Sequence, residues 1–292
     1  MQRATARIEC ADAIEFLRGL PSDSVDLVFT SPPYPNARTY GRALDLNTVD
    51  WVEWMRPIVR EACRVTRGLA FFNVSDQVAD CVYGGGPELL FADAKRIDEL
   101  ATVRPYVWVK ANSRYEAPHN GQPGSGGKHF HRNDYEPVLG FAEWEKLPPP
   151  WSDNTAYGHS PVWDAGGKMT QRTKNGSRMN TGRMATMGAA GQPDVVNPGN
   201  VIRVPVGGGK LGHPLAHESV APMPLGLAER FVCWFCPPMG TTCDPFTGSG
   251  TTADACIVHG RNFIGCDIDR DQVDLAMRRL ETVTPSMFAG VA

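Results

Sequence analysis

The sequence has no long apolar segment. Among its 292 residues the longest apolar run free of charge, 231–239, covers nine residues, whereas a membrane-spanning helix needs about 20. The N-terminal stretch reaches an acidic residue at Glu9 without the apolar core that a signal peptide carries. These absences argue against a membrane-spanning or secreted protein, and we expect an intracellular, cytoplasmic one.

A surplus of charge of one sign is also lacking. Lysine and arginine number 29 against 32 aspartates and glutamates, which gives a net charge of −3, so no overall positive field indicates a nucleic-acid partner. The segment 165–183 differs, because it holds no acidic residue and five basic ones: Lys168, Arg172, Lys174, Arg178 and Arg183. Such a basic stripe can follow a phosphate backbone, and it is equally typical of a solvated loop.

The eight cysteines show no disulfide framework, as expected for a reducing compartment. Cys233 and Cys236 form a CxxC pair, but no second CxxC and no nearby HxxxH completes a zinc site. Both lie in an apolar helical pattern, where cysteine behaves as a small hydrophobe. We predict that they pack in the core and that the protein binds no metal.

Strands and helices alternate in the first part of the chain. Apolar runs predict strands at 7–10, 24–30, 69–74 and 106–110, with helices at 12–20 and 49–66. Pro57 should kink the second helix unless that helix begins there. The βαβαβ order is typical of an α/β fold with a doubly wound parallel sheet.

An irregular stretch separates this part from the C-terminal elements. A strand is expected at 135–141, whereas 148–212 is poor in leucine and isoleucine and rich in glycine, asparagine, threonine and methionine. Because such a segment cannot build a core of its own, it is predicted to be an insertion. Regular structure then returns, with helices at 225–235, 251–259 and 270–282 and strands at 241–243 and 263–266.

A glycine-rich turn follows strand 241–243. The run Asp244-Pro-Phe-Thr-Gly-Ser-Gly-Thr-Thr252 leads into a helix whose first N–H groups can bind a carboxylate or phosphate, and its glycines allow close approach to the backbone. Asp267 and Asp269 follow the next strand, where an acidic side chain can hold ribose hydroxyls. Residues 248–253 alone also fit the GxGxxA of NAD-binding proteins, but no GK[ST] of an NTPase phosphate loop follows.

A second motif, Thr30-Ser-Pro-Pro-Tyr34, comes directly after the buried strand 24–30. Two prolines fix the backbone and supply no N–H donors, so oxygens near Ser31 and Pro32 can face the amino group of a ligand. Tyr34 offers a flat face at the end of the sheet. A tight turn with a packed tyrosine would give the same pattern.

Together the two motifs resemble the amino-methyltransferases that modify exocyclic nitrogens in DNA. Their order, with the target-base motif first and the cofactor motif last, resembles the β class, and residues 107–110, 135–139 and 217–230 resemble further segments of that family. The resemblance implies a circularly permuted methyltransferase fold with a doubly wound, mostly parallel sheet, encoded by a bacterium, an archaeon or a phage. The catalytic domain would comprise 1–141 and 213–292, and 142–212 would be the target-recognition region.

The resemblance also implies a reaction. A methyl group would pass from S-adenosyl-L-methionine to an amino nitrogen of a base flipped out of double-stranded DNA. Family members acting on cytosine N4 usually carry serine before the two prolines, whereas those acting on adenine N6 usually carry aspartate or asparagine. Ser31 therefore favours cytosine N4, and adenine N6 stays open as the alternative. Cytosine C5 methylation is disfavoured, because its nucleophilic cysteine follows a proline and no cysteine does so here.

Roles for individual residues follow from the resemblance. Ser31 Oγ and the Pro32 carbonyl would accept hydrogen bonds from the target amino group, Pro33 would help to fix the turn and Tyr34 would stack on the base. Within the cofactor site, turn 246–251 would hold the methionine part, Asp267 the ribose, and Asp12 would lie near the adenine. The predicted cofactor residues are Asp12, Thr30, Asp244, Pro245, Phe246, Gly248, Ser249, Gly250, Thr251, Thr252 and Asp267.

Two other functional classes stay open. An NAD-dependent oxidoreductase would use GxGxxA, but only 42 residues follow Gly250, so the sheet closes only if N-terminal strands complete it. A non-catalytic nucleic-acid-binding module would use the basic stripe, but it gives no reason for the Ser-Pro-Pro-Tyr run. For the methyltransferase, a cognate restriction endonuclease that shares the site without being bound is an expected partner, and a homodimer is one option for the oligomeric state.

Overall fold

A computed structural model describes residues 4–34, 50–75, 78–79, 82–83, 86–110, 135–153, 199–205, 213–219 and 222–283. The chain divides into two compact units, one formed by Met1–Ser152 with Asn200–Ala292 and the other by Asp153–Gly199. Of the smaller unit only its terminal residues, Asp153 and Gly199, are described, and the whole basic stripe lies outside the described residues.

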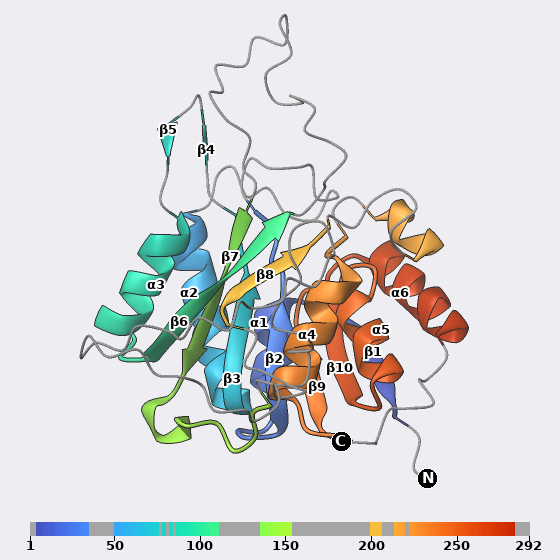
Figure 1. Cartoon of the computed structure of the whole chain (residues 1–292), viewed down its shortest axis with the longest axis horizontal. Coiled ribbons are helices and arrows are strands. Elements are labelled where there is room, and N and C mark those ends of the chain that lie inside the picture. The colour runs from blue at the N-terminus through green and yellow to red at the C-terminus, as the bar shows by residue number, and fades with distance from the viewer. Residues whose placement is uncertain are drawn as a thin grey trace, which may run out of the picture. The chain divides into compact units, whose positions relative to one another are not determined.

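The larger unit contains an eight-stranded sheet in the order β1-β10-β9-β2-β3-β7-β6-β8 (Figure 1). Its strands are β1 (Ala6–Cys10), β2 (Val25–Thr30), β3 (Thr66–Asn73), β6 (Ala101–Lys110), β7 (Tyr135–Ala142), β8 (Val201–Val204), β9 (Thr241–Asp244) and β10 (Asn262–Asp267). Two short strands, β4 (Val78–Ala79) and β5 (Val82–Tyr83), pair separately.

The sheet is mostly parallel, as the sequence predicted. The pairs β1/β10, β10/β9, β9/β2, β2/β3 and β6/β8 are parallel, and only β7 runs antiparallel to both of its neighbours. The order places the N-terminal strand β1 beside the C-terminal strand β10, and β2 beside β9. This is the permuted connection that lets the two ends of the chain complete one sheet.

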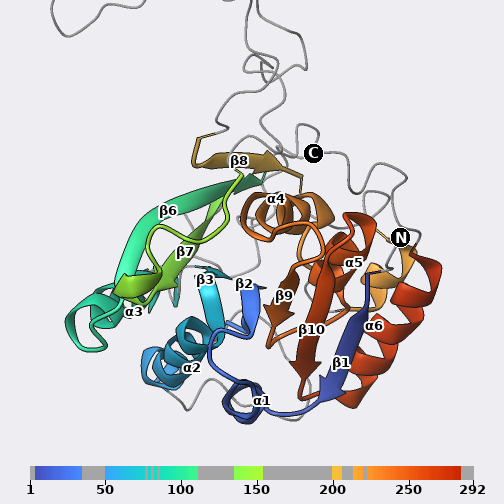
Figure 2. The ribbon, with the colours of Figure 1, turned by 90° about the horizontal axis from the view of Figure 1, so that it is seen from below.

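Helices cover both faces of the sheet (Figure 2). The helices α1 (Ala13–Gly19) and α2 (Trp51–Val65) lie on one side of the central strands, and α4 (Leu225–Phe235) and α5 (Thr251–Val258) lie on the other. The remaining helices are α3 (Gly86–Arg96), which contacts α2, and α6 (Arg270–Thr282), which contacts β1 and β10. Within the described residues, no helix combines the length and the apolar character needed to cross a membrane.

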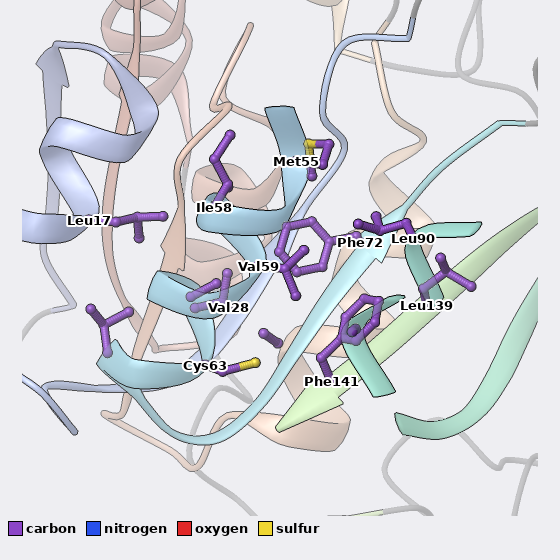
Figure 3. Packing of buried hydrophobic residues seen from close by; sticks show 14 of the residues in the cluster. Leu17, Val28, Met55, Ile58, Val59, Cys63, Phe72, Leu90, Leu139 and Phe141 are labelled. Atoms are coloured by element: carbon purple, nitrogen blue, oxygen red, sulfur yellow. The ribbon is translucent and has the colours of Figure 1, made fainter. Parts of the chain in front are cut away.

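One apolar core lies between α1–α3 and the sheet. Figure 3 shows side chains of α2 directed toward the strands, where they meet Val28 of β2, Phe72 of β3 and Phe141 of β7, all fully buried. The α2 residues labelled in that view are Met55, Ile58, Val59 and Cys63. On the opposite face, Phe29 stacks on Phe231 of α4 with ring centroids 4.5 Å apart. Because side chains alternate between the two faces of a strand, the neighbouring residues Val28 and Phe29 pack against helices on opposite faces of the sheet.

The helix α2 begins before its proline. The Asp50 carboxylate caps the helix by accepting hydrogen bonds from the N–H groups of Val52 and Glu53, which satisfies donors that have no partner within the helix. Pro57 lies inside the helix, which continues to Val65. The alternative start at Pro57 is therefore wrong, because the cap at Asp50 and the apolar face of the helix fix an earlier one.

The structure confirms the strands and helices predicted from the sequence, with bounds that differ by a few residues. The elements that were not predicted are α3, the short strands β4 and β5, the short 3-10 helices Trp144–Lys146 and Pro214–Glu218, and the edge strand β8, whose residues lie within the range 142–212. β8 is only four residues long and pairs with β6 from Val107 to Lys110. Exposed and buried residues alternate along β8, with Ile202 and Val204 buried. This pattern is too short to predict a strand from the sequence alone.

Candidate active site

The two sequence motifs meet at one edge of the sheet. β2 and β9 are parallel neighbours, with Leu27 opposite Thr242 and Val28 opposite Cys243, so the segments that follow them leave the sheet side by side. The Thr30 hydroxyl donates to Asp244 Oδ1 at 2.5 Å, and both side chains are buried. This hydrogen bond joins the start of the target-base motif to the start of the cofactor motif.

A cavity opens at this edge, with about 1190 Å³ of empty space counting the part open to solvent. It is lined by most of the predicted cofactor residues and by two of the predicted catalytic ones: Asp12, Ser31, Pro33, Asp244, Pro245, Phe246, Gly248, Ser249, Thr251, Thr252 and Asp267. Thr30, Pro32, Tyr34 and Gly250 do not line it.

The glycine-rich turn has the backbone that its sequence indicates. Gly248 and Gly250 have φ values of +50° and +82°, a region that side chains with a Cβ rarely adopt. A Cβ on Gly250 would lie 3.0 Å from that of Ala276 in α6. Among the described residues no side chain caps the start of α5, and its first residues, Thr251 and Thr252, line the cavity, so its first N–H groups are potential donors to an anion.

A buried ion pair supports this turn from behind. The Arg279 guanidinium, 1% exposed, pairs with Asp254 at 2.8 Å and donates to Thr251 Oγ1 at 2.9 Å and to the Ser249 carbonyl at 3.3 Å. Arg279 comes from α6 and the other three residues from the turn and α5. The arrangement fixes the glycine-rich turn against the last helix.

Asp267 lines the same cavity and is hydrogen-bonded to the glycine-rich turn. Its Oδ2 accepts from the Gly248 N–H and its Oδ1 accepts from the Asp269 N–H, both at 2.9 Å. Burial raises the pKa of the Asp267 carboxyl, while these two hydrogen bonds act in the opposite direction. Each oxygen retains a lone pair for a further donor. Asp12 also lines the cavity, and its Oδ1 caps α1 by accepting from the N–H groups of Ile14 and Glu15.

Asp244 is the most deeply buried carboxyl of the site. Burial raises its pKa to about 6, against hydrogen bonds from the Thr30 hydroxyl and the Phe246 N–H, which favour the charged form. The Phe246 ring, in the same turn, lies 5.7 Å from the ring of Trp54. Both aromatic side chains line the cavity and give it an apolar section.

The Thr30–Tyr34 segment is held by side chains on both sides. Trp51 Nε1 donates to the Pro33 carbonyl at 3.0 Å, and the Tyr34 hydroxyl donates to the Asn73 carbonyl at 2.9 Å. Ser31 Oγ lies 2.9 Å from the Tyr34 hydroxyl. The segment is therefore an anchored turn at the cavity, with Ser31 on the cavity side.

Comparison with known proteins identifies the family. A family model described as DNA methylase, for N6 and N4 enzymes, matches residues 25–278. The chain belongs to this DNA methylase family. The match covers β2 to α6 and therefore both motifs, which confirms the family that the sequence resembled.

Individual relatives of this DNA methylase are distant. It is 24% identical to the DNA adenine methyltransferase YhdJ of Escherichia coli K12 over 279 residues, which cover 94% of this chain and 82% of YhdJ. It is 25% identical to the type II methyltransferase M.ScaI of Streptomyces caespitosus over 281 residues, with coverage of 95% and 82%.

Solved structures show the same fold. The PvuII DNA methyltransferase, described as cytosine-N4-specific, superposes with a TM-score of 0.67 at 15% identity, covering 95% of this chain and 87% of that one. TTHA0409 of Thermus thermophilus, complexed with S-adenosyl-L-methionine, gives a TM-score of 0.55 at 21% identity, with coverage of 96% and 95%. The predicted fold is confirmed, and so is S-adenosyl-L-methionine as the cofactor of the family.

Family membership decides between the classes left open. The protein is a DNA methyltransferase that depends on S-adenosyl-L-methionine, so the GxGxxA match does not mark an NAD-dependent oxidoreductase, and the chain is not a binding module without catalysis. Cys233 and Cys236 are buried, in α4 and at its end. Within the described part of this DNA methylase, no cluster of three His, Cys, Asp or Glu side chains could hold a metal ion.

Several residues of the site were missed from the sequence. Cavity-lining residues outside the motifs are Ala13, Trp54, Ser219, Pro222, Met223, Ile268 and Gln272. Next to the Thr30–Tyr34 segment, Asn73 Nδ2 donates to Glu136 Oε2 at 2.8 Å, and Lys110 pairs with Glu136 Oε1 at 2.8 Å. Asn73 and Lys110 end their strands, so polar residues at strand ends were the signal that could have found them.

Proposed function

We propose that this DNA methylase transfers a methyl group from S-adenosyl-L-methionine to N4 of a cytosine flipped out of double-stranded DNA, within a specific sequence. The observation that carries the proposal is that Ser31 lines the same cavity as the glycine-rich turn. Serine before the two prolines favours cytosine N4, and the structural likeness to the cytosine-N4-specific PvuII enzyme supports this choice.

The donor groups around the cavity fit the cofactor. The uncapped start of α5 suits a carboxylate, the free lone pairs of Asp267 suit ribose hydroxyls, and the rings of Phe246 and Trp54 suit a flat adenine. These residues would hold S-adenosyl-L-methionine, with Asp12 near the adenine.

The chain's own atoms would make the target nitrogen reactive. When bound, S-adenosyl-L-methionine supplies an electrophilic methyl group. The exocyclic amino nitrogen is a poor nucleophile, because its lone pair is delocalised into the base. Ser31 Oγ and the Pro32 carbonyl would accept hydrogen bonds from the amino hydrogens, which localises that pair and stabilises the positive charge that develops. Binding both reactants in one cavity supplies the alignment.

Base capture and DNA binding complete the proposal. Tyr34 would stack on the flipped base and offset part of the few kcal/mol that flipping costs. The region 142–212 would recognise the DNA sequence, and its basic stripe would contact phosphates. A restriction endonuclease that cuts at the same site remains the expected partner, since the type II methyltransferase M.ScaI is among the relatives.

Adenine N6 is the second candidate. The name of the Escherichia coli relative, a DNA adenine methyltransferase, favours it, and hydrogen-bond acceptors at Ser31 and Pro32 suit the amino group of either base. Plasmid DNA methylated by the purified protein, digested to nucleosides and analysed by mass, distinguishes the two. N4-methylcytosine is expected, and N6-methyladenine would reject the choice of base.

A further inference from the structure

A chain of hydrogen bonds connects Ser31 to the antiparallel part of the sheet. Ser31 Oγ and the Tyr34 hydroxyl are 2.9 Å apart, and the Tyr34 hydroxyl lies 2.9 Å from the backbone carbonyl oxygen of Asn73. Asn73 Nδ2 lies 3.2 Å from the same hydroxyl and 3.5 Å from Ser31 Oγ. Within the part of the chain that the structure describes, these contacts place three polar groups around the tyrosine oxygen.

The directions of these hydrogen bonds follow from counting protons. A carbonyl oxygen only accepts, so the single proton of the Tyr34 hydroxyl is directed to the Asn73 carbonyl. The contact between Ser31 and Tyr34 must then use the serine proton, which Ser31 donates to the tyrosine oxygen. With its proton committed in this way, Ser31 Oγ presents only lone pairs to any other partner.

The Asn73 side chain has its own direction fixed. Glu136 Oε2, 2.8 Å away, is a carboxylate oxygen that needs a donor, so the amide nitrogen of Asn73 faces it and also faces Tyr34. The Glu136 carboxylate is held by Lys110 at 2.8 Å. Asn73 and Glu136 are only 2% and 8% exposed, and buried polar networks of this kind hold their partners in one arrangement.

We propose that Tyr34, Asn73 and Glu136 are positioning residues that keep Ser31 Oγ as a hydrogen-bond acceptor toward the target amino group. The Tyr34 hydroxyl accepts a hydrogen bond from Ser31 and donates its own proton to the backbone carbonyl of Asn73, while Glu136 keeps the side-chain amide of Asn73 from flipping. This inference rests on the role proposed for Ser31, and it holds for an amino group of cytosine or of adenine.

The inference differs from a role in stacking alone. A tyrosine that only stacks on the base could be replaced by phenylalanine without loss, because the ring remains. If the hydroxyl orients Ser31, Tyr34→Phe leaves the serine proton free to point at the amino group, and two donors then face each other. Capture of the base would be unchanged while the methyl-transfer step slows.

The test measures single-turnover methyl transfer to unmethylated plasmid DNA at saturating S-adenosyl-L-methionine, together with the KM for DNA. Tyr34→Phe should lower the transfer rate about tenfold, less than the loss of a direct transition-state hydrogen bond, with a KM for DNA within twofold of wild type. Glu136→Gln should lower the rate in the same way. Tyr106→Phe, which alters a tyrosine ring packed against Phe71 and Phe231, is the matched control and should retain the wild-type rate.

A double variant separates orientation from a general structural effect. If Tyr34 acts through Ser31, Ser31→Ala with Tyr34→Phe should be no slower than Ser31→Ala alone, because the group being oriented is gone. A wild-type rate in Tyr34→Phe, or a tenfold further loss in the double variant, would overturn the inference. The nucleoside formed is identified in the same digest, so an adenine product would reject the proposed base and leave this result intact.

Discussion

Replacing Asp267 by asparagine tests the assignment of the cofactor cavity. The carboxylate accepts two backbone N–H bonds of 2.9 Å, one from Gly248 and one from Asp269, and has about two lone-pair sites left for ribose hydroxyls. The asparagine amide has the same size but only one acceptor oxygen. Its NH2 group would then face the N–H group of either Gly248 or Asp269, so that two donors oppose each other. Asp267→Asn therefore disturbs the ribose contacts and the glycine-rich turn together.

The expected magnitude follows from those contacts. Hydrogen bonds to a charged acceptor contribute about 1.5–3 kcal/mol each, so partial loss of two should weaken binding of S-adenosyl-L-methionine by about 2–4 kcal/mol, or roughly 30-fold to 1,000-fold in Kd. Isothermal titration calorimetry measures the Kd, and a thermal melt checks that unfolding stays cooperative. Asp274→Asn, on the exposed side of α6 with its carboxylate 4.0 Å from Arg270, is the matched control and should bind as wild type. A Kd within twofold of wild type in Asp267→Asn would refute the assignment.

Three further predictions concern DNA binding, packing and pH. Changing Arg172, Lys174 and Arg178 together to alanine should lower DNA affinity and flatten the plot of log K against log salt, since fewer counterions are released; an unaltered slope would mean a solvated loop. Gly140→Ala should reduce the free energy of unfolding, measured in a denaturant titration, by about 1–3 kcal/mol, because the new Cβ would lie 2.6 Å from Phe71 Cε1 and closer still to Val103 Cγ2. The control is Gly19→Ala, which has open space at its Cβ. Equal stability of the two variants would contradict the packing described for Gly140. The pKa of His259 is raised to about 9, because hydrogen bonds with Cys233 and Glu229 outweigh the effect of burial. The contribution of His259 to stability should therefore be complete below pH 6.5 and lost as the pH rises through 9. A Glu229→Gln variant whose stability depends on pH as in the wild type would disprove this role of His259.

A helix or strand could be predicted wherever its own residues form a recognisable pattern. The helix α2 has a capping aspartate at Asp50 and an apolar face, and β2 is buried at every position except Asp26 and is followed, after Ser31, by two prolines. β8 could not be predicted in the same way, because only its pairing with β6 makes a strand of four residues. Helix α3 was missed because its weak pattern follows a glycine-rich segment.

The candidate site was likewise predictable only where a local sequence pattern marks it. The two motifs indicate the cavity, since glycines, prolines and acidic residues at strand ends have few other reasons to occur together. The network through Asn73, Glu136 and Lys110 joins three strands that are far apart in sequence. No local pattern shows that these side chains meet, because their contact depends on β7 running antiparallel between β3 and β6.

The pairing of β1 with β10 has a consequence for biosynthesis. β1 ends at Cys10 and, among the described strands, its one neighbour in the sheet begins at Asn262, so roughly 250 further residues must be synthesised before β1 can pair. At about 5–20 residues per second, roughly 250 residues correspond to about 13–50 s of translation. The same delay applies to the cofactor cavity, which takes Asp12 from one end of the chain and Asp267 from the other. A ribosome-bound nascent chain of this methyltransferase should therefore gain affinity for S-adenosyl-L-methionine only once β10 has emerged.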